Sequence, residues 1–344
     1  MAKEINVALI GYGYAGRVFH APLILGVPGL RLHSVTSSDP AKVLADHPEV
    51  RVVTAEDAFA DPAIDLAVIA TPNEFHAPLA HAALAQGKHV VVDKPFTLTV
   101  AEAEGLADHA RRAGRLLAVF HNRRWDADFL TLRRLITERR LGEVVQFESH
   151  FDRFRPQPRD RWRERAGPGS GLWFDLGPHL ADQALCLFGM PEEVEADLAL
   201  LRQGTETNDY FHVLLRYPRR RVILHGTALA AAKPLRFAVH GTESSFVKHG
   251  FDPQEDRLKA GGMPDDPGFG ADPEPGELTS MRSGSAETQR IQGEPGDYRQ
   301  FYASIREAIR QDAPNPVPPR EAVAVMEVIE AAIESAGSGR RIRL

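Results

Sequence analysis

Residues 5–24, INVALIGYGYAGRVFHAPLI, decide the fold of this chain. A short apolar run leads directly into glycines with GxGxxG spacing, and a helical pattern follows. Glycines at this spacing allow a tight turn after a strand, and the following helix N-terminus offers N–H groups to a pyrophosphate. The stretch predicts a dinucleotide-binding loop, with a ligand-free glycine turn as the alternative. The predicted cofactor contacts in this loop are Gly11, Gly13, Tyr14, Ala15 and Gly16.

The first 122 residues continue this pattern, because short apolar runs alternate with helical segments. Two of the helical segments end at Gly87 and Gly114, and glycine is the residue that most often follows a helix C-terminus. Alternation of strands and helices predicts an α/β fold with a doubly wound parallel sheet, here a Rossmann domain over residues 1–122. The expected strands are 5–10, 30–36, 50–53, 65–71, 89–94 and 116–122.

Residues 123–344 follow a different pattern and predict a second, α+β domain. After a helix near 124–140, apolar runs with alternating polarity come largely without helices between them, which indicates an open and mostly antiparallel sheet. Residues 252–297 are rich in glycine, proline and acids and are expected to form a long loop. The expected strands are 143–151, 192–200, 209–217, 220–229 and 236–241, and helices are expected at about 297–311 and 319–337.

Composition excludes several classes of protein. A length of 344 residues suits two domains, and 43% hydrophobic with 26% charged residues is globular. The formal net charge of −6 gives no electrostatic case for nucleic-acid binding, and no run is long and apolar enough to cross a membrane. The one cysteine, Cys186, lies in the apolar run ALCLFG, so we expect a buried structural thiol in a cytoplasmic protein.

The choice of cofactor depends on the end of the second strand, where NAD-specific sites usually carry an acid. The acid here is Asp39, which precedes Pro40 and therefore has the pattern of a helix N-cap. If Asp39 caps a helix, Ser37 and Ser38 line the ribose slot and do not repel a 2′-phosphate. We therefore expect NADP to be preferred, with NAD possible.

Two loops at the carboxyl ends of strands should face the cofactor, as such loops do in doubly wound sheets. The fifth strand ends in Asp93, Lys94 and Pro95, and a lysine there can hydrogen-bond a substrate hydroxyl and stabilise charge on its oxygen. A solvated surface lysine is the alternative. The fourth strand leads into ATPNEFH, whose expected cofactor contacts are Thr71, Pro72, Asn73 and His76.

The stretch DLGPH places Asp175 and His179 four residues apart, on one face of a helix. Histidine titrates near neutral pH and often serves as a general base, and an aspartate can orient it or bind substrate. The alternative is an N-cap aspartate followed by a half-buried helical histidine. The other histidines show no ligand spacing, so no metal site is predicted.

Taken together, these motifs resemble the Gfo/Idh/MocA oxidoreductase family over essentially the whole chain. The shared motifs are GxGxxG at 11–16, ATPNEFH at 70–76, DKP at 93–95, where the family more often has Glu-Lys-Pro, and DLGPH at 175–179. Residues 12–23, 120–136, 153–164 and 240–256 look most like the NADP-dependent scyllo-inositol 2-dehydrogenase branch. That branch typically ends its second strand in Ser-Arg, whereas this chain has Ser37-Ser38.

The resemblance implies an NAD(P)-dependent oxidoreductase acting on a CH–OH group of a cyclic polyol or sugar, most specifically scyllo-inositol. Another aldopyranose or anhydro sugar, an NAD-dependent glycosidase, and a non-catalytic NAD(P)-binding regulator are the alternatives. The family also implies a homodimer or homotetramer formed through the second sheet, whose exposed face should associate. The implied catalytic set is Lys94, Asp175 and His179, and these three residues also bind the substrate. Further cofactor contacts are assigned to Asp93, Lys94, Asn122 and Trp162. Further substrate contacts are assigned to Arg124, Arg155 and Arg161, and Asn122 and Trp162 can also contact the substrate.

Overall fold

The computed structural model describes residues 4–344, with only the backbone described for Arg282. The chain forms two compact units. The predicted division after residue 122 stays a prediction. Of the described residues, the first unit contains 4–125, 254–269 and 297–323, and the second contains 126–253, 270–296 and 324–344.

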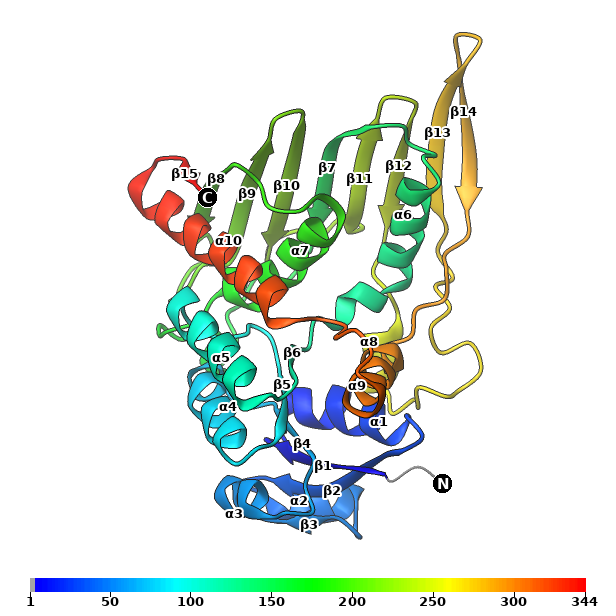
Figure 1. The fold of residues 1–344 in the computed structure, drawn as a ribbon. Coiled ribbons are helices and arrows are strands. Elements are labelled where there is room, and N and C mark those ends of the chain that lie inside the picture. Colours follow the sequence, from blue (N-terminus) through cyan, green and yellow to red (C-terminus); the bar gives the residue numbers. More distant parts are fainter. Residues whose placement is uncertain (1–3) are drawn as a thin grey trace. The chain divides into compact units, whose positions relative to one another are not determined.

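The first unit is built on a six-stranded parallel sheet with the strand order β3-β2-β1-β4-β5-β6 (Figure 1). This is the order of a Rossmann fold, so the predicted doubly wound sheet is confirmed. The central strands are almost completely buried because helices cover both of their faces. The strands are β1 (Ile5–Ile10), β2 (Leu30–Thr36), β3 (Arg51–Val52), β4 (Leu66–Ile69), β5 (His89–Val92) and β6 (Leu117–Val119).

Local signals in the sequence explain where the helices of this unit begin and end. The longest of the crossover helices, α5, begins with a capping box between Thr99 and Glu102 and ends at Gly114, which has a left-handed conformation. The helices are α1 (Ala21–Leu25), α2 (Pro40–Asp46), α3 (Ala55–Ala60), α4 (His76–Ala85), α5 (Val100–Ala113), α8 (Gln254–Lys259) and α9 (Arg299–Gln311).

The second unit is built on a nine-stranded sheet with the order β14-β13-β12-β11-β7-β10-β9-β8-β15. Only β7 and β10 pair in parallel, so the predicted open and mostly antiparallel sheet is confirmed. The strands are β7 (Val144–His150), β8 (Glu193–Ala199), β9 (Tyr210–Tyr217), β10 (Arg220–Thr227), β11 (Leu235–Gly241), β12 (Ser244–His249), β13 (Gly276–Arg282), β14 (Ser285–Ile291) and β15 (Ile342–Arg343).

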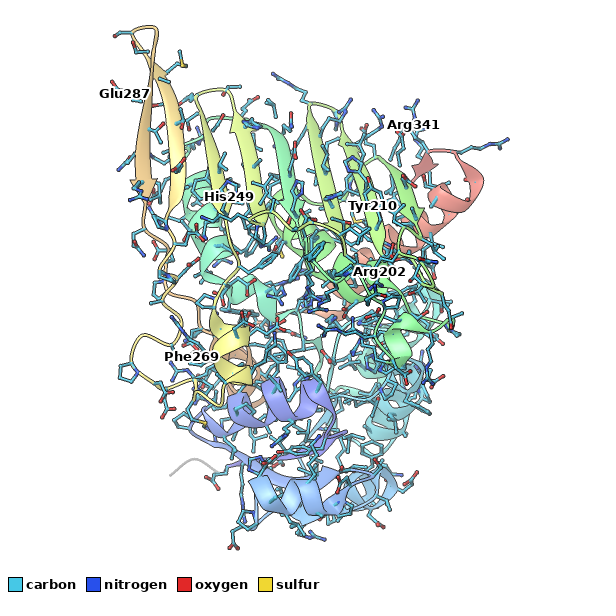
Figure 2. All side chains as sticks on the ribbon, turned by 180° about the vertical axis from the view of Figure 1, so that it is seen from behind. Arg202, Tyr210, His249, Phe269, Glu287 and Arg341 are labelled. Atoms are coloured by element: carbon cyan, nitrogen blue, oxygen red, sulfur yellow. The ribbon has the colours of Figure 1, made fainter. Side chains whose placement is uncertain are left out.

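The helices α6 (Ala127–Thr137) and α7 (Leu172–Phe188) and the second-unit part of α10 (Pro319–Ser338) lie on one face of this sheet (Figure 1). Figure 2 views the sheet from behind, with the strands in front of these helices. Strand residues that point toward α7, such as Val222 and Leu224 on β10, are fully buried. Ile223 and His225, which alternate with them along the strand, point to the opposite face and are half-buried.

The prediction of a long loop at 252–297 is wrong. This stretch contains α8 and the hairpin of β13 and β14, which turns at Ser283 and Gly284, both with positive φ. The strand β14 is exposed along six of its seven residues, so its sequence shows no alternation of apolar and polar side chains. Strand pairing without a buried face leaves almost no hydrophobic pattern from which to predict it.

The expectation of a buried Cys186 is also wrong, because its side chain is exposed. It lies in the last turns of α7, where burial ends after Ala184. The apolar run alone does not show where the helix extends beyond its packing partners. Within residues 4–344, no helix is long and apolar enough to span a membrane.

Candidate functional site

The three glycines of the loop after β1 differ in why each position needs a residue without a Cβ. Gly11 has a φ of +103°, and a Cβ there would lie 2.5 Å from the Ala70 carbonyl oxygen. A Cβ on Gly16 would lie 2.1 Å from the Gly11 oxygen. A Cβ on Gly13 would meet nothing within 4 Å. The chain's own packing therefore requires two of the glycines, and the open space at Gly13 fits a pyrophosphate that approaches the backbone closely.

This difference predicts the effects of two matched substitutions. Gly13→Ala should raise the dissociation constant for NADP⁺ at least about tenfold, roughly 1.4 kcal/mol, because the new methyl group occupies the ligand's space. Its melting temperature should stay close to that of the wild type. Gly16→Ala should instead lower the melting temperature. Calorimetric titration and thermal melts check both results, and unchanged NADP⁺ binding by Gly13→Ala would contradict a cofactor in this loop.

The end of β2 leads into a capped helix, as its sequence predicts. Asp39 is the N-cap of α2, and its Oδ1 accepts a hydrogen bond of 3.2 Å from the backbone N–H of Lys42. The Ser37 hydroxyl accepts a bond of 3.1 Å from the Asp39 N–H, and Ser38 is exposed. The carboxylate of Asp39 therefore caps its own helix. In an NAD-specific site, the acid at this position usually points at the ribose of the cofactor instead.

The loop after β5 carries Lys94, whose side chain is half-buried, followed by a cis peptide bond to Pro95. The preceding Asp93 is buried, and its Oδ1 accepts a hydrogen bond of 2.8 Å from the Lys94 N–H. The same oxygen lies 3.9 Å from Nε2 of the buried His20. Burial acts to raise the pKa of Asp93, but His20, with smaller contributions from Lys94 and His76, outweighs it and lowers that pKa to about 2.

The low pKa of Asp93 makes stability depend on pH in a defined direction. An unfolded aspartate has a pKa of about 3.9, so the ionised carboxylate contributes about 2–3 kcal/mol above that pH. This contribution is lost as the pH falls toward 2. The difference in unfolding free energy between wild type and Asp93→Asn should therefore narrow by about that amount between pH 6 and pH 2. Urea unfolding at several pH values measures it, with the exposed Asp108→Asn as control; a difference that is constant with pH would contradict the assignment.

His76 connects the two loops that follow β4 and β5. Its Nδ1 lies 2.8 Å from the carbonyl oxygen of Pro95, and its Nε2 lies 3.0 Å from that of Thr71. The side chain is 1% exposed. These contacts give His76 a positioning role, because one ring holds the loop of Lys94 against the loop of the ATPNEFH motif. In that motif Asn73 is buried and Pro72 is exposed.

In the second unit, Asp175 and His179 both lie on α7, one helical turn apart. Gly171 is the N-cap of this helix, so Asp175 does not cap it and the N-cap part of that alternative is wrong. A Cβ on Gly177 would lie 2.5 Å from the ring of the buried Trp173, which explains the glycine between them. Asp175 is half-buried, and His179 is 6% exposed.

Asn208 is a positioning residue that the sequence analysis missed. Its Oδ1 accepts a hydrogen bond of 2.8 Å from the Trp173 N–H, and its carbonyl accepts one of 2.8 Å from the Leu172 N–H. It therefore caps the start of α7 from a loop more than thirty residues away. No local signal marks a cap supplied from such a distance.

Asp175 lines a pocket of the second unit that is rich in arginine. Arg163 approaches it, with Nε 3.6 Å from Oδ1 of Asp175. Burial and the neighbouring Arg153, Arg159 and Arg161 lower the pKa of Arg155 to about 10, so Arg155 remains charged at neutral pH. The pocket is lined by Arg153, Arg155, Arg161, Arg163, Glu164, Gly171, Leu172, Asp175, Arg202, Thr207, Asn208, Asp209 and Ala228. Such a pocket offers many hydrogen-bond donors to hydroxyl or anionic groups.

The remaining predicted contacts have clear positions but stay predictions. Tyr14 is exposed, and its hydroxyl donates to Glu255 at 2.9 Å. Asn122 is buried in the 3₁₀ turn Asn122–Trp125. In the same turn, Arg124 donates from Nη1 to Pro316 O at 3.0 Å and to Glu321 Oε2 at 2.7 Å.

Two predicted contacts in the second unit also have partners of known geometry. Trp162 is exposed, with the guanidinium of Arg163 stacked 4.5 Å from its ring centroid. Arg161 donates from Nε to Glu164 at 2.8 Å. Both positions adjoin the arginine-rich pocket, which Arg161 and Arg163 line.

Comparison with protein families matches this architecture on both units. Residues 5–121 match the model described as "Oxidoreductase family, NAD-binding Rossmann fold", and residues 133–344 match "Oxidoreductase family, C-terminal alpha/beta domain". The chain belongs to the Gfo/Idh/MocA oxidoreductase family. The predicted family, the oxidoreductase class and the NAD-binding Rossmann domain are confirmed.

Several members of the Gfo/Idh/MocA family resemble the chain along its whole length. It is 56% identical to the uncharacterized oxidoreductase YdgJ of Escherichia coli, covering 98% of this chain and 97% of the relative. It is 42% identical to scyllo-inositol 2-dehydrogenase (NADP(+)) IolW of Bacillus subtilis, covering 99% and 96%. The solved structure of the YPO2259 protein of Yersinia pestis has a TM-score of 0.96 at 54% identity, covering 100% and 98%.

Within this Gfo/Idh/MocA chain, the predicted catalytic residues come from both units. Lys94 belongs to the first unit, and Asp175 and His179 belong to the second. Each is held by contacts within its own unit, through Asp93 and His76 in one case and through α7 in the other. Their common action on one substrate is a proposal.

Proposed function

We propose that the chain catalyses reversible hydride transfer between NADP(H) and a ring CH–OH group of a cyclic polyol, with scyllo-inositol and its 2-ketone as the substrate pair. The observation that carries this proposal is the full-length similarity to an enzyme named scyllo-inositol 2-dehydrogenase (NADP(+)), at 42% identity. Asp175 and His179 on one face of α7 support it, because a cyclic polyol presents adjacent hydroxyls to such a pair.

Each residue has a defined role in this proposal. His179 removes the proton from the hydroxyl that becomes the carbonyl, and Lys94 donates a hydrogen bond to that oxygen as negative charge develops on it. Asp175 holds a neighbouring hydroxyl or orients the base. When bound, the nicotinamide cofactor supplies the hydride acceptor, and the protein provides geometry and charge.

The preference for NADP rests on the end of β2. Asp39 is engaged as the cap of α2, so no acid there repels a 2′-phosphate. Ser37 and Ser38 offer hydroxyl groups, and Lys42 follows in the first turn of the helix. NAD remains the alternative cofactor, because no arginine stands at this position to bind the phosphate bidentately.

The test is a panel of inositols, aldopyranoses and 1,5-anhydro sugars, assayed with NADP⁺ and NAD⁺ by absorbance of the reduced nicotinamide. We expect the highest kcat/KM for scyllo-inositol with NADP⁺. Turnover of a pyranose or an anhydro sugar without turnover of any inositol would move the substrate to that class. No turnover of any compound with either cofactor would overturn the proposal and favour a non-catalytic NAD(P)-binding regulator.

A further inference from the structure

A row of histidines crosses the face of the second sheet that is opposite α7. His150 on β7 pairs in register with His225 on β10, and His225 pairs with His212 on β9. Residues paired in this way point to the same face of a sheet. This face is the one turned toward the viewer in Figure 2, where Tyr210 on β9 is labelled. The ring of Tyr210 packs edge-on against the ring of His225, with 5.3 Å between the ring centroids.

Asp152 joins this row from the end of β7, two residues after His150 and therefore on the same face. Its Oδ2 lies 3.6 Å from Nδ1 of His150, and its Oδ1 lies 3.5 Å from Nε2 of His225. One ligand atom from each of these three residues lies within 4.8 Å of the other two. The three side chains are only 13–17% exposed, so water screens them weakly.

The hydrogen bonds around this cluster leave lone pairs on a ring nitrogen of His150 and on the carboxylate of Asp152, and these lone pairs face each other. Nε2 of His150 lies 3.1 Å from Oε2 of Glu148, so a neutral His150 that donates there presents a lone pair from Nδ1 to Asp152. Oδ1 of Asp152 is buried and has no hydrogen-bond partner among the described residues. Acceptors that face acceptors need a cation between them, either a proton or a metal ion.

The geometry of the cluster suits a metal ion. The ring centroids of His150 and His225 lie 5.0 Å apart, and a nitrogen of each ring lies within 3.6 Å of an oxygen of Asp152. Two imidazoles with one carboxylate are a common ligand set for zinc.

We propose that His150, Asp152 and His225 bind one divalent transition-metal ion, with Zn²⁺ as the representative ion. Tetrahedral zinc with bonds of about 2.0–2.1 Å separates its ligand atoms by roughly 3.4 Å. The contacts of Asp152 with His150 at 3.6 Å and with His225 at 3.5 Å therefore need only small side-chain rotations. The fourth position is open to water or to His212, whose ring centroid lies 5.6 Å from that of His225.

The surroundings of the cluster have the second layer of contacts that metal sites usually show. A ligating histidine normally donates its other ring N–H to a carboxylate, and Glu148 stands in that position for His150. Glu148 is itself held by Gln146, whose Nε2 donates to Oε1 at 2.6 Å. The ion would join β7 to β10, the parallel pair at the centre of the sheet, on the face opposite α7, which carries Asp175 and His179. The site was not predictable from the sequence because two of its ligands, His150 and His225, lie 75 residues apart on different strands.

The test uses the untagged full-length chain, stripped with a chelator and titrated with ZnCl₂ against a competing chromophoric chelator. Metal content after dialysis gives the stoichiometry. We expect one zinc ion per chain and a rise in melting temperature with zinc. Asp152→Asn and His225→Gln should each weaken zinc binding at least about 100-fold, and Glu148→Gln should weaken it about 10- to 100-fold.

The matched control is His240→Gln, which removes a histidine from β11 of the same sheet but outside the cluster. It should bind zinc like the wild type. The proposal is overturned if the wild type binds no zinc at a defined stoichiometry, or if Asp152→Asn and His225→Gln bind as tightly as His240→Gln. Should either ligand variant fail to fold, Glu148→Gln decides, since unchanged affinity in that variant also counts against the site.

Discussion

Replacing His179 by glutamine is expected to lower kcat for scyllo-inositol oxidation by about 10²- to 10⁴-fold, the usual contribution of a general base. The buried imidazole on α7 is the proposed proton acceptor, and a glutamine of similar size cannot take the proton. Because the substrate hydroxyls still meet Asp175 and the arginine-rich pocket, KM should change much less than kcat. Steady-state kinetics with NADP⁺ separates the two constants.

A structural role for His179 would give a different pattern. In that case the variant would lose stability and cofactor binding together with activity, and Asp175→Asn would have no effect on rate. We expect instead that His179→Gln melts near the wild-type temperature and binds NADP⁺ normally. His240→Gln serves again as the control for removal of a histidine. Full activity of His179→Gln would refute the assignment of the base.

Replacing Lys94 by methionine is expected to lower kcat/KM by about 10²- to 10³-fold, roughly 3–4 kcal/mol of transition-state stabilisation. Methionine keeps the length of the side chain and removes the charge that is proposed to face the developing oxygen anion. Lys94→Arg should not restore the rate, because a planar guanidinium places its charge differently from an ammonium group. The measurement is kcat/KM for scyllo-inositol with saturating NADP⁺.

The same strand supplies a matched control at its other end. Lys88 precedes β5, and its Nζ donates to the carbonyl oxygens of Asp61 at 2.7 Å and Ile64 at 3.0 Å. Lys88→Met should therefore lower stability, since one buried and one partly buried carbonyl lose their donor, and leave kcat/KM close to the wild-type value. If both lysine variants lowered kcat/KM equally, the loss at Lys94 would reflect the strand and not the chemistry.

The Rossmann sheet was predictable because its strands are short apolar runs between glycines and helical segments, and their burial agrees with that pattern. Valines 90–92 are completely buried, as their unbroken apolar run indicates. The β13–β14 hairpin was not predictable for the opposite reason. Its pairing is held by backbone hydrogen bonds and contacts such as that between the Thr279 and Thr288 hydroxyls, not by a core.

The candidate site was predictable where a local sequence pattern determines the structural role of a side chain. The Asp39-Pro40 pair predicted a helix cap, and the structure confirms it. Contacts between distant segments were not predictable in this way. His76 connects two loops, and Asn208 caps α7 from a distant loop, and neither contact leaves a mark in the adjacent sequence.

The polar hairpin also bears on how the protein avoids aggregation. The strand β14 is the last strand at one edge of a nine-stranded sheet, and in Figure 2 the label of Glu287 marks its exposed length. An open edge offers unpaired backbone groups to any other extended chain. Glu287 and Arg290 place charges along this edge, so a second molecule that adds a strand there must desolvate them. The lack of apolar residues that made β14 unpredictable from the sequence thus also keeps this edge of the sheet solvated and opposes the addition of another strand.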